Sequence, residues 1–282
     1  MYTLSVENTY GDILELTNNP AYCISNVDGI DPPEATINTA RNAGADGSVF
    51  NSAYMNNRTI TITMAINGPA ERNRIELYRY FKSRFPLRLH YSNGSRSVYI
   101  DGYVQSMQIA FFDQKQTAQI VIECPQPLFN GSALSVQEFA NVQALFEFPF
   151  SIPQAGIPFS EILPYVEKSI INEGDVETGV VIEIKAVGPV VNPKIYDVDT
   201  NESFILNITM SEGDLITINT RRGEKSVKLT SGGVTTNIVG YLQDGSTWFN
   251  LLPGDNVFTT NASANPENML VTFTIINQYE GV

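Results

Sequence analysis

The residue types that most often carry out catalysis are sparse in this chain. It has a single histidine, His90, so a two-histidine metal motif cannot form within it. A Ser-His-Asp triad would need His90 in a pocket, yet the stretch 87–91 (Leu-Arg-Leu-His-Tyr) predicts a strand just before a turn. The sequence contains no Gly-x-Ser-x-Gly elbow, P-loop or dinucleotide fingerprint. We therefore expect no catalytic residues and no cofactor.

The best metal candidate is the stretch 197–202 (Asp-Val-Asp-Thr-Asn-Glu), which places oxygen ligands at alternate positions as the start of a calcium loop does. Glu202 stands where such a loop needs its turn glycine, and Ile208 stands where it needs a bidentate glutamate. The pattern instead predicts a polar hairpin turn between strands at 194–198 and 203–210. We expect no metal site.

Two features leave carbohydrate chemistry open. Glycoside hydrolysis needs paired carboxylates, and nothing in the sequence singles out a pair among the 30 acidic residues. Tyr241 and Trp248 are aromatic side chains of the kind that stack on sugars, although 248–252 also predicts a core strand. A carbohydrate-binding module therefore remains an alternative, and so does a hydrolase acting on the cell wall.

The charge of the chain disfavours nucleic acid as a partner. The net charge is −13, and residues 130–282 contribute most of it, with 7 Lys and Arg against 18 Asp and Glu. Phosphate binding needs clustered basic residues. The N-terminus does not resemble a signal peptide, and no apolar run reaches the length of a membrane span. We therefore expect cytoplasmic synthesis, no membrane insertion, and two reduced cysteines, Cys23 and Cys124.

Strand patterns dominate the sequence. In 58–66, Ile60, Ile62, Met64 and Ile66 alternate with threonine and alanine, which predicts a half-buried strand. Similar patterns recur between turn dipeptides such as Asn-Gly and Asp-Gly, at 98–104, 118–123, 180–185, 215–219, 226–229 and 269–276. Many short strands separated by turn signals predict a mainly β fold of the sandwich or barrel kind.

One helix is expected between Pro69 and Pro86. Apolar residues three and four apart predict its buried stripe, and basic residues would occupy the remaining surface. The stripe comprises Ile75, Tyr78, Phe81 and Phe85, and the basic residues include Arg72 and Arg79.

A domain boundary is expected where the stretch 124–132 (Cys-Pro-Gln-Pro-Leu-Phe-Asn-Gly-Ser) interrupts the strands. It divides the chain into domains 1–130 and 131–282. A second irregular stretch, residues 31–57, is too long for a plain connection and predicts an arm that reaches toward a partner. We call residues 31–57 the arm.

The order of these features resembles the distal tail protein of long-tailed phages that infect Gram-positive bacteria, the siphovirus tail-component family. The resemblance rests on Asp28-Gly29, Asp46-Gly47-Ser48, Asn57-Arg58 with the strand 59–66, the helix and Asp101-Gly102 in the first half. In the second half it rests on the stretches 171–175 (Ile-Asn-Glu-Gly-Asp), 188–193 (Gly-Pro-Val-Val-Asn-Pro), 213–220 and 251–256.

The resemblance implies two domains. The N-terminal belt domain would be a β-sandwich with one helix and would form the ring, and the C-terminal domain would be a galectin-like β-sandwich. It implies a virion structural protein of the tail tip or baseplate that assembles as a hexamer. Its neighbours would be the tail-tube protein and a tail-associated hub, lysin or receptor-binding protein. We expect the arm to supply the subunit interface, together with Asp46, Gly47, Asn57, Arg58, Arg72 and Arg79.

Overall fold

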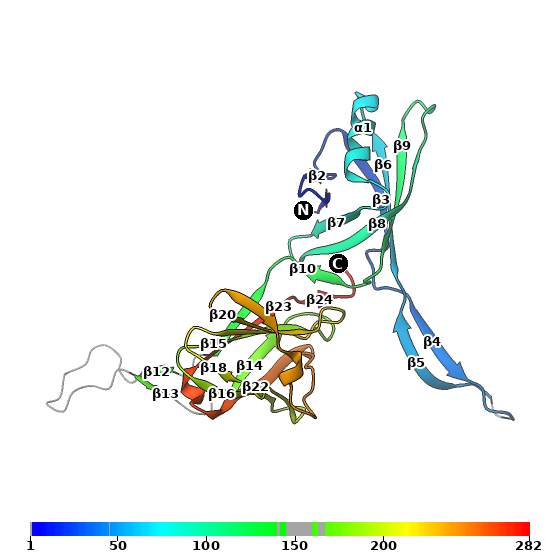
Figure 1. The fold of residues 1–282 in the computed structure, drawn as a ribbon. Coiled ribbons are helices and arrows are strands. Elements are labelled where there is room, and N and C mark those ends of the chain that lie inside the picture. The colour runs from blue at the N-terminus through cyan, green and yellow to red at the C-terminus, as the bar shows by residue number, and fades with distance from the viewer. Residues whose placement is uncertain (1, 45, 140–141, 145–159, 163–166) are drawn as a thin grey trace, which may run out of the picture. The chain divides into compact units, whose positions relative to one another are not determined.

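The computed structural model describes residues 2–44, 46–139, 142–144, 160–162 and 167–282, which fold as two units (Figure 1). Unit 1 comprises Met1–Ala133 and Gln278–Val282, and unit 2 comprises Leu134–Asn277. The division after Ala133 lies close to the expected boundary at 130. The expected range 131–282 is wrong at its end, because residues 278–282 return to unit 1 and pair with it there.

Unit 1 is built around an antiparallel nine-stranded sheet. Its main path runs in the order β2-β1-β7-β8-β9-β6-β3, and β10 pairs with both β8 and β24. The strands are β1 (Thr3–Glu7), β2 (Ile13–Glu15), β3 (Tyr22–Asp28), β6 (Arg58–Ile66), β7 (Pro86–Ser92), β8 (Ser97–Ile109), β9 (Thr117–Cys124), β10 (Phe129–Gly131) and β24 (Gln278–Tyr279).

The expected alternation along β6 is confirmed. Ile60, Ile62, Met64 and Ile66 are all buried, while the threonines between them face the other side of the strand. Because successive side chains of a strand point to opposite faces, this parity also applies to Arg58, which opens β6 on the buried face. The Arg58 side chain therefore lies on the same side of β6 as the buried side chains of Ile60 and Ile62.

The α-helix of unit 1, α1 (Ala70–Tyr80), packs against β6, but its buried face differs from the expected stripe. Leu77 and Asn73 are the buried helical residues, and Phe81 is buried directly after the helix. Ile75, Tyr78 and Phe85, which we expected to be buried, are exposed by 51%, 41% and 51%. The prediction failed because it counted apolar residues and overlooked Asn73. The side-chain amide of Asn73 donates to the backbone oxygen of Asn67, and the backbone carbonyl oxygen of Asn73 accepts from the Tyr22 hydroxyl.

The arm is a regular β-hairpin, not the irregular segment that the sequence predicted. Among the strands that the structure describes, β4 (Ala35–Ala40) and β5 (Val49–Met55) pair only with each other, and they extend beyond the nine-stranded sheet (Figure 1). Both strands are exposed along nearly their whole length, so they lack the one-sided burial that β6 shows. Isolated two-stranded hairpins have marginal stability in water.

Unit 2 is a β-sandwich. A six-stranded sheet, ordered β11-β23-β15-β19-β20-β21, faces a five-stranded sheet, ordered β14-β22-β16-β17 with β18 beside β16. The strands are β11 (Ser135–Phe139), β14 (Glu167–Asn172), β15 (Val180–Ala186), β16 (Val190–Asp197), β17 (Glu202–Ile205), β18 (Thr209–Met210), β19 (Leu215–Asn219), β20 (Ser226–Ser231), β21 (Val234–Asn237), β22 (Gly254–Ala264) and β23 (Met269–Ile275).

Two shorter kinds of element complete the described part of unit 2. Two 3₁₀ helices, η1 (Val239–Tyr241) and η2 (Pro266–Asn268), lie in its connections. A separate pair is formed by β12 (Val142–Ala144) and β13 (Ser160–Ile162).

Aromatic side chains join the two sheets of the sandwich. Phe258 on β22 and Phe273 on β23 lie with ring centroids 5.2 Å apart, and Phe249 meets Phe258 edge-on at 5.3 Å. All three rings are at most 1% exposed. Such pairs stabilise a core beyond their buried area. The mainly β fold with one α-helix among the described residues is therefore as expected.

Candidate subunit interface

The arm presents an apolar face that the described part of the chain does not cover. Cross-strand pairs place Ala35 opposite Met55 and Ile37 opposite Ala53, and after a bulge Thr39 lies opposite Phe50. Partners that lie opposite each other project from the same side of a hairpin. Ile37 and Phe50 are 64% and 63% exposed. We call Ala35, Ile37, Phe50, Ala53 and Met55 the apolar face of the arm.

The opposite face of the arm is more polar and is satisfied within the hairpin. Asn38 Nδ2 donates to Ser52 Oγ at 3.1 Å, and Thr36 Oγ1 donates to Asn56 Oδ1 at 3.0 Å. Tyr54 and Val49 are the large apolar residues on this side. An exposed apolar surface rimmed by polar groups is typical of a protein-binding site. The apolar face of the arm is therefore the candidate binding surface of the hairpin.

Three predicted interface residues lie on the arm in positions that the sequence suggested. Asp46 and Gly47 lie in the loop that joins β4 to β5, where Gly47 has a φ of +87°. Asn57 follows β5 at the base of the arm and is exposed. These residues mark the tip and the base of the hairpin, whereas the apolar face lies between them. Ile37 and Phe50 were not among the predicted interface residues. Because β-branched and aromatic residues are enriched in strands, their presence in an expected loop was a usable signal for a hairpin.

Arg58, predicted to contact a neighbouring subunit, is in fact turned into its own subunit. Arg58 is only 3% exposed, and its guanidinium lies 4.5 Å from the centroid of the Phe129 ring. It donates to four backbone carbonyl oxygens of unit 1, those of Gly29, Asp31, Pro127 and Glu280. This part of the interface prediction is corrected, because the buried guanidinium has its hydrogen bonds within the chain.

Arg72 and Arg79 lie on the outward face of α1 and are exposed. Among the described residues, neither guanidinium has an ion-pair partner. Arg74 differs, because it pairs with Glu71 and lies 4.7 Å from the centroid of the Phe111 ring. With Ile75 and Tyr78 also exposed, the outward face of α1 combines positive charge and apolar surface.

The two residues proposed to stack on a sugar occupy different environments. Trp248 packs at the edge of the sandwich core, with its ring 5.3 Å from that of Phe204 in an edge-on arrangement. The ammonium of Lys225 lies 5.6 Å from the Trp248 ring centroid, a cation–π distance. Tyr241 is on η1 and is 52% exposed. Trp248 is therefore half-buried against the core, whereas Tyr241 is exposed.

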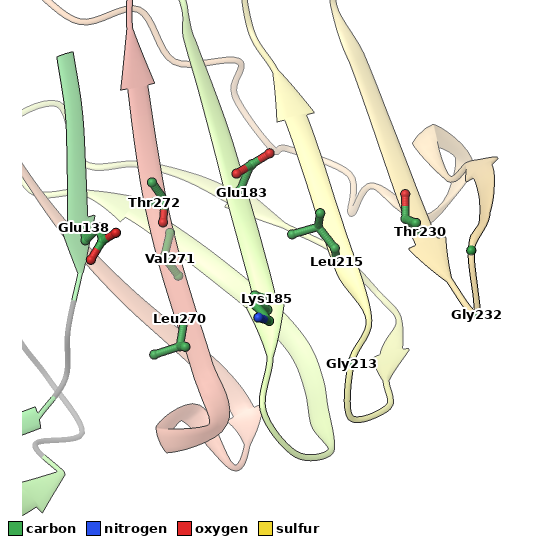
Figure 2. A pocket seen from close by; sticks show the side chains of 11 residues that line it. Glu138, Glu183, Lys185, Gly213, Leu215, Thr230, Gly232, Leu270, Val271 and Thr272 are labelled. Carbon is green, nitrogen blue, oxygen red and sulfur yellow. The ribbon is translucent and has the colours of Figure 1, made fainter. Parts of the chain in front are cut away.

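A shallow recess lies on the outer face of the six-stranded sheet (Figure 2). It has a volume of about 540 Å³, and Glu183 and Lys185 of β15 project into it between Thr272 of β23 and Leu215 of β19. Ile182 and Ile184 alternate with these charged residues and face the core. None of the described residues that line the recess is aromatic, so it offers no stacking platform for a sugar ring.

The residues considered for chemistry have structural contacts. His90 lies on β7, as the sequence predicted, and its Nε2 is 2.8 Å from Glu7 Oε2 on the neighbouring strand. Asp197 Oδ1 accepts the backbone N–H groups of Asp199 and Thr200, which closes the expected hairpin turn between β16 and β17. Within the described residues there is no cluster of three potential metal ligands. In that same part of the chain, no helix is long and apolar enough to cross a membrane.

Comparison with known families gives two matches along the chain. Residues 11–124 match the phage tail protein RIFT-related domain, and residues 173–275 match the C-terminal domain of the siphovirus-type tail component. No curated protein sequence matches the chain.

Solved structures with this fold include the Dit protein of phage SPP1, described as a paradigm of the hub adsorption apparatus in phages that infect Gram-positive bacteria. The TM-score is 0.69 at 14% identity, covering 99% of each chain. A chain of the phage P2 baseplate in its activated conformation with Ca matches over 100% of both chains, with a TM-score of 0.56 at 12% identity.

Proposed function

Because this chain belongs to the siphovirus-type tail component family and is a structural protein of the phage tail, we propose that it forms a ring at the tail tip. The ring, hexameric by family analogy, would join the tail tube to the host-adsorption apparatus. Its neighbours in the virion would be the tail-tube protein on one side and a hub, lysin or receptor-binding protein on the other.

The observation that carries this proposal is the apolar face of the arm. The hairpin pairs with no other strand in the described residues, and its large side chains are exposed, so it gains little stability from that part of the chain. Burying Ile37 and Phe50 against another molecule would contribute about 1.5–3 kcal/mol for each side chain. We infer that a second copy of this chain covers this face.

In a ring, one surface of each subunit contacts a different surface of the next subunit, and the ring closes when a rotation relates successive subunits. Each subunit therefore needs two different surfaces. The arm would be one surface, and a sheet edge of the next copy would be the other. Within the described part of unit 1, β3 pairs with β6 alone and β2 pairs with β1 alone, so each has one unpaired edge. Unpaired edges are sites for strand addition.

The outward face of α1 is proposed to contact a different neighbour. Arg72 and Arg79 carry positive charge that no described carboxylate neutralises, beside exposed Ile75 and Tyr78. An acidic surface with an apolar centre would complement both features and would accelerate docking. This assigns the arm to contacts between copies and α1 to contacts with the tube or the hub.

We further propose that the chain works by assembly without catalysis. His90 is engaged with Glu7 on adjacent strands, and Asp197 closes a turn, so the residues that most suited chemistry serve the fold.

The test uses two variants on opposite faces of the same hairpin. Ile37→Asp places a carboxylate on the apolar face, and Val49→Asp places one on the polar face at similar exposure. Burying an unpaired carboxylate costs several kcal/mol, so Ile37→Asp should weaken self-association more than about tenfold. Val49→Asp should weaken it much less. The measurement is the mass distribution by light scattering across a concentration series, and equal behaviour of the two variants would contradict the role of this face.

A further inference from the structure

Both ends of the arm meet at one side chain. Arg58 directly follows the arm, and its Nη1 donates to the carbonyl oxygens of Gly29 and Asp31, at the point where the arm begins, at 2.6 Å each. The same guanidinium donates from Nε to Pro127 O at 2.6 Å and from Nη2 to Glu280 O at 2.5 Å. One residue therefore closes the base of the arm and holds residues 125–128 and 278–282 beside it.

The backbone around this point is tightly packed. Gly29 has a φ of +87°, and a Cβ there would lie 2.1 Å from Thr59 O, so only glycine lets the chain pass β6 at this point. Val282 N donates to Ile30 O, and a Cβ on Gly281 would lie 3.1 Å from Pro32 Cδ. Residues 278–282 thus contact the base of the arm directly as well as through Arg58.

Arginine is suited to this position in a way that lysine is not. The guanidinium has five N–H donors in a fixed planar fork, whereas an ammonium has three donors on a flexible stem. Burial lowers the pKa of Arg58, with the charges of Asp31 and Glu280 acting in the opposite direction. Bonds from a charged donor to carbonyl groups are stronger than neutral ones, and four of them offset the cost of burying this charge.

We propose that Arg58 is the positioning residue of the arm, fixing both ends of the hairpin to residues 278–282 so that the apolar face is presented in one orientation. This rests on the proposed function of the arm in assembly, but the contacts themselves lie within one chain. The inference predicts that loss of the fork frees the base of the arm and residues 278–282 together, and leaves the sheet interior unchanged.

Hydrogen exchange tests this directly. Arg58→Lys should raise the exchange rate of the arm base, 28–34 and 56–57, and of residues 278–282 by about tenfold, as expected for the loss of charge-assisted hydrogen bonds. Exchange of the paired amides of β6 and β9 should remain unchanged. Arg88→Lys is the control, because the Arg88 guanidinium, like that of Arg58, lies over an aromatic ring and donates to oxygen atoms, in this case the Asp101 carboxylate, but Arg88 is on β7 and makes no contact with the base of the arm. Unchanged exchange in Arg58→Lys, or a uniform rise across unit 1, would overturn the proposal.

A second variant keeps the test decisive if Arg58→Lys does not fold. Gly281→Leu leaves Arg58 intact but places a side chain against Pro32, so it should free the same two regions. Unchanged exchange there would count against the proposal. All variants are compared in the Ile37→Asp background, where the arm stays uncovered. Failure of wild-type ring formation would refute the proposed function and leave this result standing.

Discussion

At the scale of single residues, the two cysteines differ in how far they are buried. Cys124 lies at the end of β9, is fully buried, and faces Arg58, which opens β6 directly opposite. Burial raises the pKa of the Cys124 thiol to about 12, and the nearby guanidinium opposes this less strongly. Cys23 on β3 is also a free thiol, but it is exposed.

The two thiols should therefore differ in reactivity. The thiolate is the nucleophile, and a thiol with a pKa of about 12 is almost entirely protonated at pH 8. We expect iodoacetamide at pH 8 to label Cys23 in the folded protein and to label both cysteines in denaturant. Peptide mass mapping measures this. Equal labelling of Cys124 and Cys23 in the folded state would show that the environment of Arg58 is open to solvent.

Phe258 provides a second test at this scale, because its ring contacts both Phe249 and Phe273 across the sandwich. Phe258→Ala should lower the free energy of unfolding of unit 2 by about 3–5 kcal/mol through loss of burial and a residual cavity. Phe50→Ala on the exposed arm should change it by less than about 0.5 kcal/mol. Urea denaturation followed by tryptophan fluorescence distinguishes them, since Trp248 lies in unit 2. Similar losses in both variants would contradict this assignment of the core.

At the scale of elements, the sequence identified strands more reliably than faces of the helix. Ile60, Ile62 and Met64 alternate without exception, and β6 follows that pattern. In α1 the apolar residues are spread around the helix, and tertiary contacts selected Leu77 and a hydrogen-bonded Asn73 for the interior. Hydrophobicity alone could not identify Asn73 as buried.

The arm and Arg58 differ in how far they could be predicted. Residue parity places Arg58 on the face of Ile60 and Ile62, so the sequence contained the signal that it points inward. No comparable local signal announces that residues 278–282 would supply its fourth carbonyl, because that contact joins positions 222 residues apart. The hairpin form of the arm was missed because Gly and Pro residues at its base and tip suggested an irregular segment, although Ile37 and Phe50 were a usable strand signal.

The orientation of α1 can be tested with two aspartate substitutions. Leu77→Asp would bury an unpaired carboxylate beneath the helix and should prevent unit 1 from folding or lower its stability by several kcal/mol. Ile75→Asp is two residues away but exposed, and it should leave the circular dichroism spectrum and thermal midpoint nearly unchanged. The reverse order of effects would favour the stripe that the sequence predicted.

At the scale of the whole molecule, the central claim is that this tail protein functions as a ring. Its arm has an apolar surface that the described part of its own chain leaves uncovered, and Arg58 donates hydrogen bonds to the base of that arm. The most direct measurement is electron microscopy of the purified full-length chain across a concentration series. We expect rings with a central opening and six-fold symmetry. Particles that remain monomeric at the highest concentration would contradict it.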